Sequence, residues 1–521
     1  MRRAALLVLW PLALPAQPST IEGHVSNAVT REPLAKASVV LARASGEPAQ
    51  TTTTDSTGKF FIGGLEPGRY RLRVSRRGFV TLESRPVLDL TRARELTGID
   101  LRLTPYGVLS GRILDGDGEP PAGAQVQLLR MRYLNGKRKL ATTKVAFAND
   151  LGEYRWLDIE PGRYYIYAEN WENTPAPVGE EGPVPVYYPG AAEPAGAAPI
   201  DVAAGAQVRV QDLALGKART GSVKGRVVVE LPGAESMPSV RFHRTTGHDN
   251  SAAGTYHTPA AKVNTAGEFE IHGLTPGLYI AGAQVAKGGR AYAGWTTVEV
   301  SGANVEGVVI TVGAGLTLAG RIRAEDPARL DLKNARVKLW RTSSLADSLA
   351  VGWEERVAAD RTFRIDGLDP ARYGLLIAGL PDGFYLKSVR AGGTDVTYSG
   401  VDLASGSPGA IEILVGGKPG QVSGTVRNAD KQPVPGAIVA LVPADAQRPT
   451  IPEFYPEAAA GENGGFTFRN VPPGEYKVYA WEIIEPSAWM DPEFLRPFKD
   501  SAAPVTVGEN APASVQVSIS Q

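Results

Sequence analysis

The chain has 521 residues, with 55 basic and 55 acidic side chains and no cysteine. The missing cysteines exclude disulfides, thiol nucleophiles and cysteine metal sites. The balanced charge gives no electrostatic footprint for nucleic acid or for an anionic membrane. Glycine (59) and proline (40) are abundant beside an apolar content of 43%, which indicates packed cores joined by many turns.

The first residues have the composition of an export signal. Two arginines precede an apolar run from Ala4 to Leu14, and small residues follow up to Ala16. This order is typical of a secretory signal peptide, here residues 1–16. The run is shorter than the roughly 20 residues that span a bilayer, and an uncleaved anchor is the alternative. We expect an exported mature protein, secreted, periplasmic or at the cell surface, with no membrane span once the signal is removed.

One phrase then recurs about every 100 residues, a period that suits a small domain rather than a solenoid unit. The five copies are GKFFIGGLEPGRY (58–70), GEYRWLDIEPGRY (152–164), GEFEIHGLTPGLY (267–279), RTFRIDGLDPARY (361–373) and GGFTFRNVPPGEY (464–476). Upstream of each copy, a glycine opens a short strand. These triplets are GHV at Gly23, GRI at Gly111, GRV at Gly225, GRI at Gly320 and GTV at Gly424.

The residues within each copy alternate with the period of a strand. In the first copy, Tyr70, Leu72 and Val74 alternate with arginines, which is typical of a half-buried antiparallel strand. The sequence predicts an all-β fold of five tandem antiparallel β-sandwiches, immunoglobulin-like or prealbumin-like. The final tyrosine of each copy is expected to pack in the core and to bond backbone through its hydroxyl. The predicted domains are 17–104, 105–217 with a Pro/Gly-rich insertion at 174–199, 218–313, 314–416 and 417–521.

These residues resemble the carboxypeptidase regulatory-like domain family, close kin of CnaB-type and transthyretin-like (prealbumin-like) sandwiches. The matching pattern is G-x-[VI], then P-x-x-x-A-x-V-x-L, then D-x-x-G-x-F-x-[IF]-x-x-L-x-P-G-x-Y. The first and fifth repeats match best, whereas the fourth departs at Arg361 and Ala371. The resemblance implies a domain that accompanies a peptidase, not a peptidase.

Kinship with CnaB-type domains also raises the question of a Lys–Asn isopeptide crosslink. Lys224 and Asn304 in the third repeat are the candidates. Strand parity places Lys224 on the outward face together with Arg226, because Gly225 and Val227 share the inward face. This parity argues against the crosslink.

The sequence offers no catalytic constellation. None of the five histidines belongs to an H-E-x-x-H motif, and there is no G-x-S-x-G elbow. His243, His248 and His257 lie together in the third repeat, and we interpret them as polar loop residues rather than a metal site. We therefore predict no enzymatic activity, no cofactor and no metal, with a cryptic hydrolase as the less favoured alternative.

Aromatic residues near two insertions are the remaining candidates for a binding site. Trp171, Tyr187 and Tyr188 flank the insertion at 174–199, and Trp481 and Trp489 flank another insertion. Flat rings can stack on pyranose faces, and loops at sandwich ends often carry binding residues. We predict that these five residues bind ligand; the alternative is that the rings cap the sandwich or seal joints between domains.

The expected function is that of a non-enzymatic binding, adhesion or spacer protein of the cell envelope. Carbohydrate is the leading ligand class, by analogy with related sandwiches. The alternative is a structural stalk or accessory module that docks a protein partner and binds no small ligand. The expected partners are a polysaccharide or a cell-envelope protein, and not nucleic acid.

Overall fold

The computed structural model describes residues 19–43, 48–83, 88–90, 95–121, 123–170, 179–234, 236, 238–249, 259–288, 290–342, 352–404, 406, 408–445 and 447–520. The predicted signal peptide, residues 1–16, lies outside these ranges. Helical structure is limited to short turns: η1 (Pro194–Gly196), η4 (Pro452–Phe454), η5 (Ala488–Met490), α1 (Pro492–Leu495) and η6 (Arg496–Phe498). Within the described residues, no helix is both long and apolar enough to cross a membrane.

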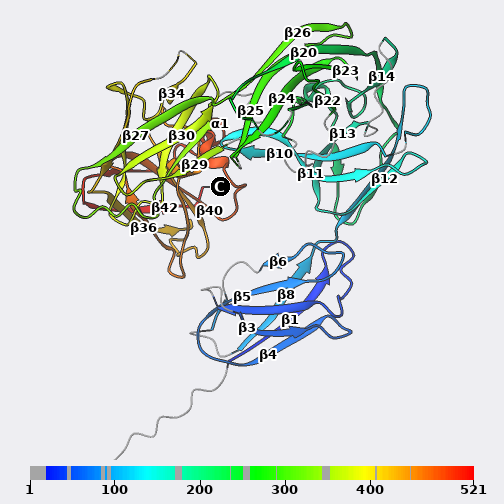
Figure 1. Cartoon of the computed structure of the whole chain (residues 1–521). Helices are drawn as coiled ribbons and strands as arrows, with labels where there is room; N and C mark the ends of the chain where they lie inside the picture. Colours follow the sequence, from blue (N-terminus) through cyan, green and yellow to red (C-terminus); the bar gives the residue numbers. More distant parts are fainter. Residues whose placement is uncertain are drawn as a thin grey trace, which may run out of the picture. The chain divides into compact units, whose positions relative to one another are not determined.

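The other regular secondary structure of the described residues is strand, and each of five successive segments forms two principal sheets (Figure 1). The prediction of an all-β sandwich fold is therefore confirmed. In every segment, the strand that carries the motif glycine lies between the first strand of the repeated phrase and a strand from the end of the segment. The second strand of the phrase belongs to the opposite sheet. Burial of alternate residues on the facing surfaces forms the cores.

The first segment has the sheet orders β4-β1-β8 and β3-β2-β5-β6, with β7 also paired to β5. Its strands are β1 (Ser19–Asn27), β2 (Ser38–Arg43), β3 (Pro48–Thr53), β4 (Lys59–Leu65), β5 (Arg69–Ser75), β6 (Leu82–Glu83), β7 (Leu88–Asp89) and β8 (Glu95–Leu103).

The second segment has the orders β12-β9-β17 and β11-β10-β13-β15, and β14 pairs with β19. Its strands are β9 (Gly107–Leu114), β10 (Gln125–Leu134), β11 (Lys137–Phe147), β12 (Glu153–Ile159), β13 (Gly162–Glu169), β14 (Glu181–Val184), β15 (Val186–Tyr187), β16 (Ile200–Val202), β17 (Gln207–Arg209), β18 (Leu213–Ala214) and β19 (Gly216–Arg219).

The third segment has the orders β23-β20-β26 and β22-β21-β24-β25. Its strands are β20 (Gly221–Glu230), β21 (Ser239–Arg244), β22 (Ala260–Lys262), β23 (Glu268–Leu274), β24 (Gly277–Lys287), β25 (Arg290–Val300) and β26 (Val305–Gly313).

The fourth segment has the orders β30-β27-β35-β32-β33 and β29-β28-β31-β34. Its strands are β27 (Leu316–Ala324), β28 (Arg336–Arg341), β29 (Gly352–Arg356), β30 (Thr362–Leu368), β31 (Arg372–Ala378), β32 (Tyr385–Ala391), β33 (Thr394–Asp395), β34 (Val401–Asp402) and β35 (Ile411–Gly416).

The fifth segment has the orders β39-β36-β42 and β38-β37-β40-β41. Its strands are β36 (Gly420–Arg427), β37 (Ile438–Pro443), β38 (Glu457–Ala459), β39 (Gly465–Val471), β40 (Gly474–Trp481), β41 (Ala503–Val507) and β42 (Pro512–Ser518).

The sheets depart from a wholly antiparallel arrangement at one pairing. The glycine strand runs parallel to the strand that closes the segment, as in β1 with β8, β20 with β26, β27 with β35 and β36 with β42. Parallel neighbours need a long connection, and the intervening strands of the segment supply it.

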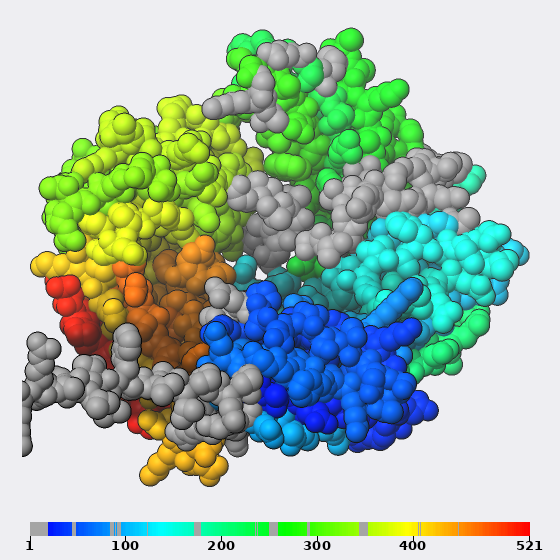
Figure 2. Space-filling model, turned by 90° about the horizontal axis from the view of Figure 1, so that it is seen from below, coloured from blue at the N-terminus to red at the C-terminus, as the bar shows by residue number. Residues whose placement is uncertain are grey.

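In the space-filling view, the blue residues of the first segment lie together as one body (Figure 2). By its internal contacts the chain divides into two compact units. One contains residues up to Gly107 with residues 158–161 and 203–206, and the other contains the remainder. The predicted domain boundaries stay predictions.

The motif glycine is required by close packing against the repeated phrase. An ideal Cβ at Gly23 would lie 2.6 Å from the ring of Phe60, and one at Gly424 would lie 2.7 Å from the ring of Phe466. These distances are too short for a real Cβ contact. The glycine therefore lets the first buried aromatic of the phrase lie across the neighbouring strand.

The final tyrosine of each phrase, which we call the anchor tyrosine, is at most 4% exposed in every segment. In four segments its hydroxyl donates to the backbone carbonyl four residues earlier. The bonds are Tyr70 to Glu66 at 2.8 Å, Tyr279 to Thr275 at 2.9 Å, Tyr373 to Asp369 at 3.1 Å and Tyr476 to Pro472 at 2.8 Å. The predicted structural role of these tyrosines is thus confirmed.

An arginine supports the anchor tyrosine, and the sequence analysis did not find it. Arg43, Arg244 and Arg341 lie directly across the sheet from Tyr70, Tyr279 and Tyr373, respectively. Their guanidinium groups reach the side chain of the residue whose carbonyl accepts the tyrosine hydroxyl. The pairs are Arg43 with Glu66, Arg244 with Thr275 and Arg341 with Asp369.

In the fifth segment a proline, Pro443, lies across from Tyr476, so an arginine cannot occupy this position. Arg448 from the following loop takes over, because it donates to the Tyr476 hydroxyl at 3.0 Å and lies 5.2 Å from the ring centre. The arginine contact is thus kept by a residue from another part of the chain.

Replacing Tyr70 by Phe removes the hydroxyl and keeps the ring, so it tests the anchor bond alone. We expect a loss of about 1 kcal/mol in the opening free energy of the first segment, because a part-buried hydrogen bond between the Tyr70 hydroxyl and the Glu66 carbonyl is lost. Hydrogen exchange of peptides covering 69–75 in the full chain should be about fivefold faster. Tyr106→Phe in the same unit is the control, and equal exchange rates in the two variants would contradict the anchor role.

Candidate functional site

Two of the predicted ligand-binding residues, Trp481 and Trp489, lie inside a buried cluster. Each is 4% exposed. Trp481 stacks on Tyr479 with ring centres 5.6 Å apart, and the indole N–H of Trp489 donates to the Tyr455 carbonyl at 3.2 Å. Neither ring presents a face to solvent, which does not fit stacking against a sugar. Their position fits the alternative that the rings seal a joint between domains, because Phe494 contacts both Trp481 and Tyr133 of the second segment.

Of the three predicted residues near the insertion, the structure describes two. Tyr187 is 2% exposed and Tyr188 is half-buried. Trp171 lies outside the described residues. The four predicted residues that the structure describes therefore do not form an open binding site, and the prediction for Trp171 stays untested.

Tyr187 instead belongs to a buried polar cluster between the second and third segments. The Tyr187 hydroxyl lies 2.7 Å from Nδ1 of His248, and Nε2 of His248 lies 3.0 Å from Oε1 of Gln127. An amide oxygen can only accept, so the ring proton lies on Nε2 and Nδ1 accepts from the tyrosine. The neutral imidazole is fully bonded, and burial lowers the pKa of His248 to about 4.

A buried carboxylate completes this cluster. Glu169 accepts from the Tyr167 hydroxyl at 3.2 Å and from Nε2 of Gln127 at 3.3 Å. Burial raises the pKa of Glu169, while its hydrogen bonds and the positive charge of Arg244 oppose the rise. The cluster joins two segments through bonded side chains, so it is best understood as a structural joint.

Backbone bonds fix the same joint. The Asp249 N–H donates to the Leu140 carbonyl, and the Asp249 carbonyl accepts from the Thr142 N–H, both at 2.9 Å. The loop that carries His248 is thereby held against the edge of β11. Among the described residues, no group of acidic and histidine side chains could hold a metal ion.

Lys224, the candidate for a crosslink, has an exposed side chain that lies 3.1 Å from Oε1 of Glu270. Asn304 instead accepts from the Ser222 N–H at 3.2 Å. The outward direction predicted from strand parity is confirmed.

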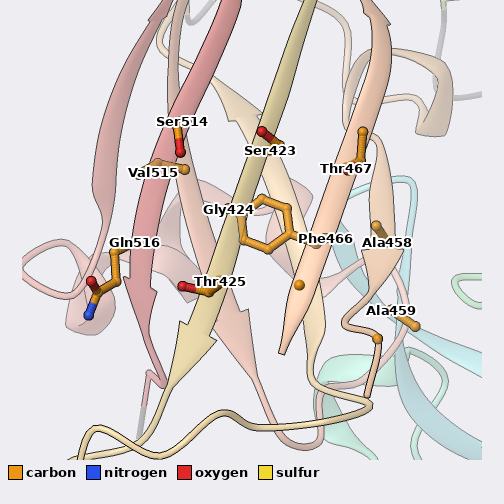
Figure 3. Close-up of a pocket in the computed structure, with 12 residues that line it drawn as sticks. Ser423, Gly424, Thr425, Ala458, Ala459, Phe466, Thr467, Ser514, Val515 and Gln516 are labelled. Carbon is orange, nitrogen blue, oxygen red and sulfur yellow. The ribbon is translucent and has the colours of Figure 1, made fainter. Parts of the chain in front are cut away.

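An open polar hollow lies on the outer face of the β39-β36-β42 sheet in the fifth segment (Figure 3). Its volume is about 730 Å³. The register places Ser423 between Thr467 and Ser514, and Thr425 between Gly465 and Gln516. We call the five side chains Ser423, Thr425, Thr467, Ser514 and Gln516 the polar face.

The hollow arises from one position of the G-x-V motif. The residue after the motif glycine is Thr425 in the fifth segment. In the other four segments it is long and basic or aromatic: His24, Arg112, Arg226 and Arg321. A short side chain in the middle of the sheet leaves space that the longer ones would fill. The signal lies in the sequence itself, because strand parity puts the residue after the motif glycine on the outer face, and GTV carries a short residue where the other four triplets carry His or Arg.

The polar face has free hydrogen-bonding capacity. Within the part of the chain that the structure describes, none of its five side chains makes a hydrogen bond. No ionisable group lines the hollow. Hydroxyl and amide groups can donate and accept, so the surface suits a neutral ligand that carries many hydroxyls, and it offers no acid, base or nucleophile pair for catalysis.

Comparison with known families agrees with the repeat pattern. The sequence model of the carboxypeptidase regulatory-like domain matches residues 20–104 and 421–485. These ranges cover the first segment and most strands of the fifth, so the resemblance inferred from the motifs is confirmed there. No curated protein matches the chain.

Several solved structures have similar parts. The minor pilin GBS52 of Streptococcus agalactiae is 14% identical, over 38% of this chain and 96% of its own, with a TM-score of 0.24. The Bacillus anthracis TIE protein is 11% identical, over 96% and 67%, with a TM-score of 0.15. The major pilin BcpA of Bacillus cereus is 11% identical, over 57% and 99%, with a TM-score of 0.16. At such scores the fold assignment rests on the sheets themselves.

The buried joint predicts a pH dependence. In the unfolded chain the pKa of His248 is near 6.5, and in the folded chain it is about 4. The folded state is therefore fully stable above pH 6.5 and loses stability as the pH falls towards 4. We expect the unfolding free energy of wild type to fall by about 3 kcal/mol more than that of His248→Gln between pH 7 and pH 4.

The measurement is urea unfolding of the full chain at each pH, read by hydrogen exchange of peptides covering 138–147. Glu169 has a raised pKa and so adds stability on acidification, but it does so in both proteins and leaves the difference intact. His24→Gln in the first segment should follow wild type. A His248→Gln protein as acid-sensitive as wild type would refute the role of the histidine.

Proposed function

We propose that this chain is an exported, non-enzymatic binding and spacer protein of the cell envelope. Repeated sandwich segments support the spacer role, because each supplies its own core and its own anchor tyrosine. The N-terminal residues 1–16 support export, since they have the charge and apolar pattern of a signal peptide. The match to carboxypeptidase regulatory-like domains agrees with an accessory rather than a catalytic role.

The ligand that fits best is a neutral polysaccharide, bound on the polar face of the fifth segment. One observation carries this proposal: Thr425 stands where the other segments have His or Arg, and the resulting hollow combines the uncharged hydroxyl and amide groups of the polar face with small and apolar residues such as Ala458 and Phe466. A neutral glycan presents complementary donors and acceptors at many points. This surface replaces the buried tryptophans as the proposed sugar site.

A protein partner is the second candidate, and an edge strand favours it. β3 lies at the edge of its sheet, and five of its six residues are exposed. Such an edge offers unpaired backbone groups to a strand from another protein. In this case the chain would act as a stalk that binds no small ligand.

Thr425→Arg tests the sugar site, because it gives the fifth segment the side chain that stands at this position in three others. We expect at least a tenfold loss of binding to neutral glycans, measured on a glycan array and then by calorimetry with the best glycan, since the long side chain fills the hollow. Thr506→Arg, an exposed threonine on β41 of the same segment, is the matched control.

Equal loss in the two variants, or full binding by Thr425→Arg, would contradict the proposed site. Silence of the wild-type protein across the array would favour the stalk. Hydrolysis of ester, peptide or glycoside substrates by the purified protein would overturn the non-enzymatic assignment altogether.

A further inference from the structure

The hairpin formed by β10 and β11 concentrates positive charge. Between Glu119 and Asp150 the chain has six basic side chains and no acidic one. The whole stretch 105–217 nevertheless has fourteen acidic and eleven basic residues, so the excess is local. Such a concentration of one sign attracts anions even though the net charge of the chain is zero. The six residues are Arg130, Arg132, Lys137, Arg138, Lys139 and Lys144.

The strand register places three of these cations on one face near the turn of the hairpin. Arg132 lies directly opposite Lys139, and Leu134 lies opposite Lys137. Opposite residues, and residues two positions apart along a strand, project from the same face. Arg132 and Lys137 are therefore diagonal neighbours, with about 7–8 Å between their Cα atoms, a distance that long side chains can bridge.

Two of these three cations remain for a ligand. Arg132 and Lys137 are exposed, and neither makes a hydrogen bond or ion pair with any residue that the structure describes. Lys139 makes an interaction within the protein. Arg130, on the same face, lies over the ring of the anchor tyrosine Tyr164, 5.8 Å from its centre. The uncompensated charge is thus that of Arg132 and Lys137.

The opposite face of the hairpin is held against the fifth segment. The Tyr133 N–H donates to Oε1 of Glu485 at 3.3 Å, and the Tyr133 ring packs edge-on against Phe494, with centres 5.6 Å apart. Gly136 in the turn lies so close to Met490 that an ideal Cβ there would be 2.8 Å from the Met490 carbonyl oxygen. The end of the hairpin is therefore ordered before any ligand arrives, which lowers the entropic cost of binding.

Acids of the fifth segment act on this packed face. Burial raises the pKa of the Tyr133 hydroxyl, the charge of Arg138 opposes the rise, and the charges of Asp491 and Glu485 add to it. Arg138 is the register partner of Tyr133 and shares its face. Asp491 and Glu485 thus offset Arg138, and they form no ion pair with the two cations on the other face.

The turn adds a neutral polar group. Asn135 and Gly136 both have positive φ, 47° and 68°, as a two-residue hairpin turn of type I′ requires. Asn135 is exposed, and its side-chain amide makes no hydrogen bond within the described part of the chain. An amide both donates and accepts, so it can bond a hydroxyl group. We call Arg132, Asn135 and Lys137 the basic tip.

We propose that the basic tip binds an acidic polysaccharide, a chain of sugars that carry carboxylate or sulfate groups. The planar guanidinium of Arg132 matches two oxygens of one acid group, Lys137 binds an oxygen of the same group or the next, and Asn135 bonds a hydroxyl. An exposed charge pair contributes little alone, so a polymer that makes several contacts at once fits better than a small anion. The choice of a glycan rests partly on the proposed envelope function.

Two other polyanions fit the hairpin less well. Single-stranded nucleic acid stacks its bases on aromatic rings, but Tyr133, the aromatic residue nearest the turn, packs on the opposite face. An acidic peptide that added as a strand would need the free edge of β11. Asp249 already occupies that edge, because its N–H donates to the Leu140 carbonyl and its carbonyl accepts from the Thr142 N–H.

Polygalacturonate and dextran sulfate are the carboxylate and sulfate probes, with uncharged dextran, poly-L-glutamate and DNA as comparisons. Binding of the full chain to each immobilised polymer is measured by biolayer interferometry over a range of salt concentrations. We expect an acidic glycan to bind at least tenfold more tightly than poly-L-glutamate or DNA, and more weakly as salt rises. Tighter or equal binding of poly-L-glutamate or DNA, or binding of neither acidic glycan, would overturn the proposal.

The double variant R132Q/K137Q removes both charges at exposed positions and should bind the acidic glycan about tenfold more weakly. The matched control is R241Q/K262Q in the third segment. Arg241 and Lys262 are also exposed diagonal neighbours, because Lys262 lies opposite Ser239. The control should bind like wild type. Equal loss in the two double variants, or full binding by R132Q/K137Q, would refute the site.

The basic tip and the polar face are tested independently, because they belong to different segments. Thr425→Arg should leave binding of the acidic glycan unchanged, and R132Q/K137Q should leave binding of neutral glycans unchanged. Uncharged dextran is therefore compared in the Thr425→Arg background, where the polar face is filled, and should bind at least tenfold more weakly than the acidic glycan. Loss of acidic-glycan binding in Thr425→Arg would place that glycan on the polar face and overturn the proposal.

Discussion

The hydrogen bond from the anchor tyrosine to the carbonyl four residues earlier is the constraint that four of the five segments share. It ties the second strand of the repeated phrase to the turn that precedes it, so the two sheets are linked at the point where the chain crosses between them. The supporting arginine then bonds either the side chain of the residue that accepts the tyrosine hydroxyl or the tyrosine itself. A buried ring, a backbone bond and a cation thus act at one place, and loss of any one of them removes an interaction between the strand and the turn that precedes it.

A second constraint acts in the opposite sheet. The motif glycine admits the first buried aromatic of the phrase, as Gly225 does for Phe269 and Gly320 does for Phe363. Since the glycine faces inward, the residue after it must face outward. The same short motif therefore fixes the core packing on one side of the strand. The residue after the glycine is not constrained by the core, and it determines which side chain the outer face exposes to solvent.

The strands and the structural role of the anchor tyrosines could be predicted because they depend on local alternation and on a repeated pattern. The parallel pairing of the glycine strand could not, because alternation does not show strand direction. The supporting arginines could not, because only the register shows that Arg341 lies opposite Tyr373. His248 was interpreted as a polar loop residue, and its pairing with Tyr187 joins two segments without any periodic signal. Trp489 was expected in an open loop, whereas the turn around η5 folds it under its neighbours.

Binding surfaces are therefore expected where neither the anchor tyrosine nor the motif glycine constrains the side chains. The fifth segment has two hollows at such places. The polar face exists because position 425 carries a short side chain that the core does not constrain, so its change to Thr costs the fold little. A second hollow, lined by Trp481, Ile483 and Phe494 among others, exists because the chain after β40 leaves the sheet and returns through helical turns, outside the repeated pattern. Both hollows lie on a segment whose anchor arginine also comes from a loop, Arg448 in place of a strand residue. A sandwich that accepts a loop arginine in place of a strand arginine can also carry new binding surfaces, because the anchor tyrosine and the motif glycine keep the core unchanged.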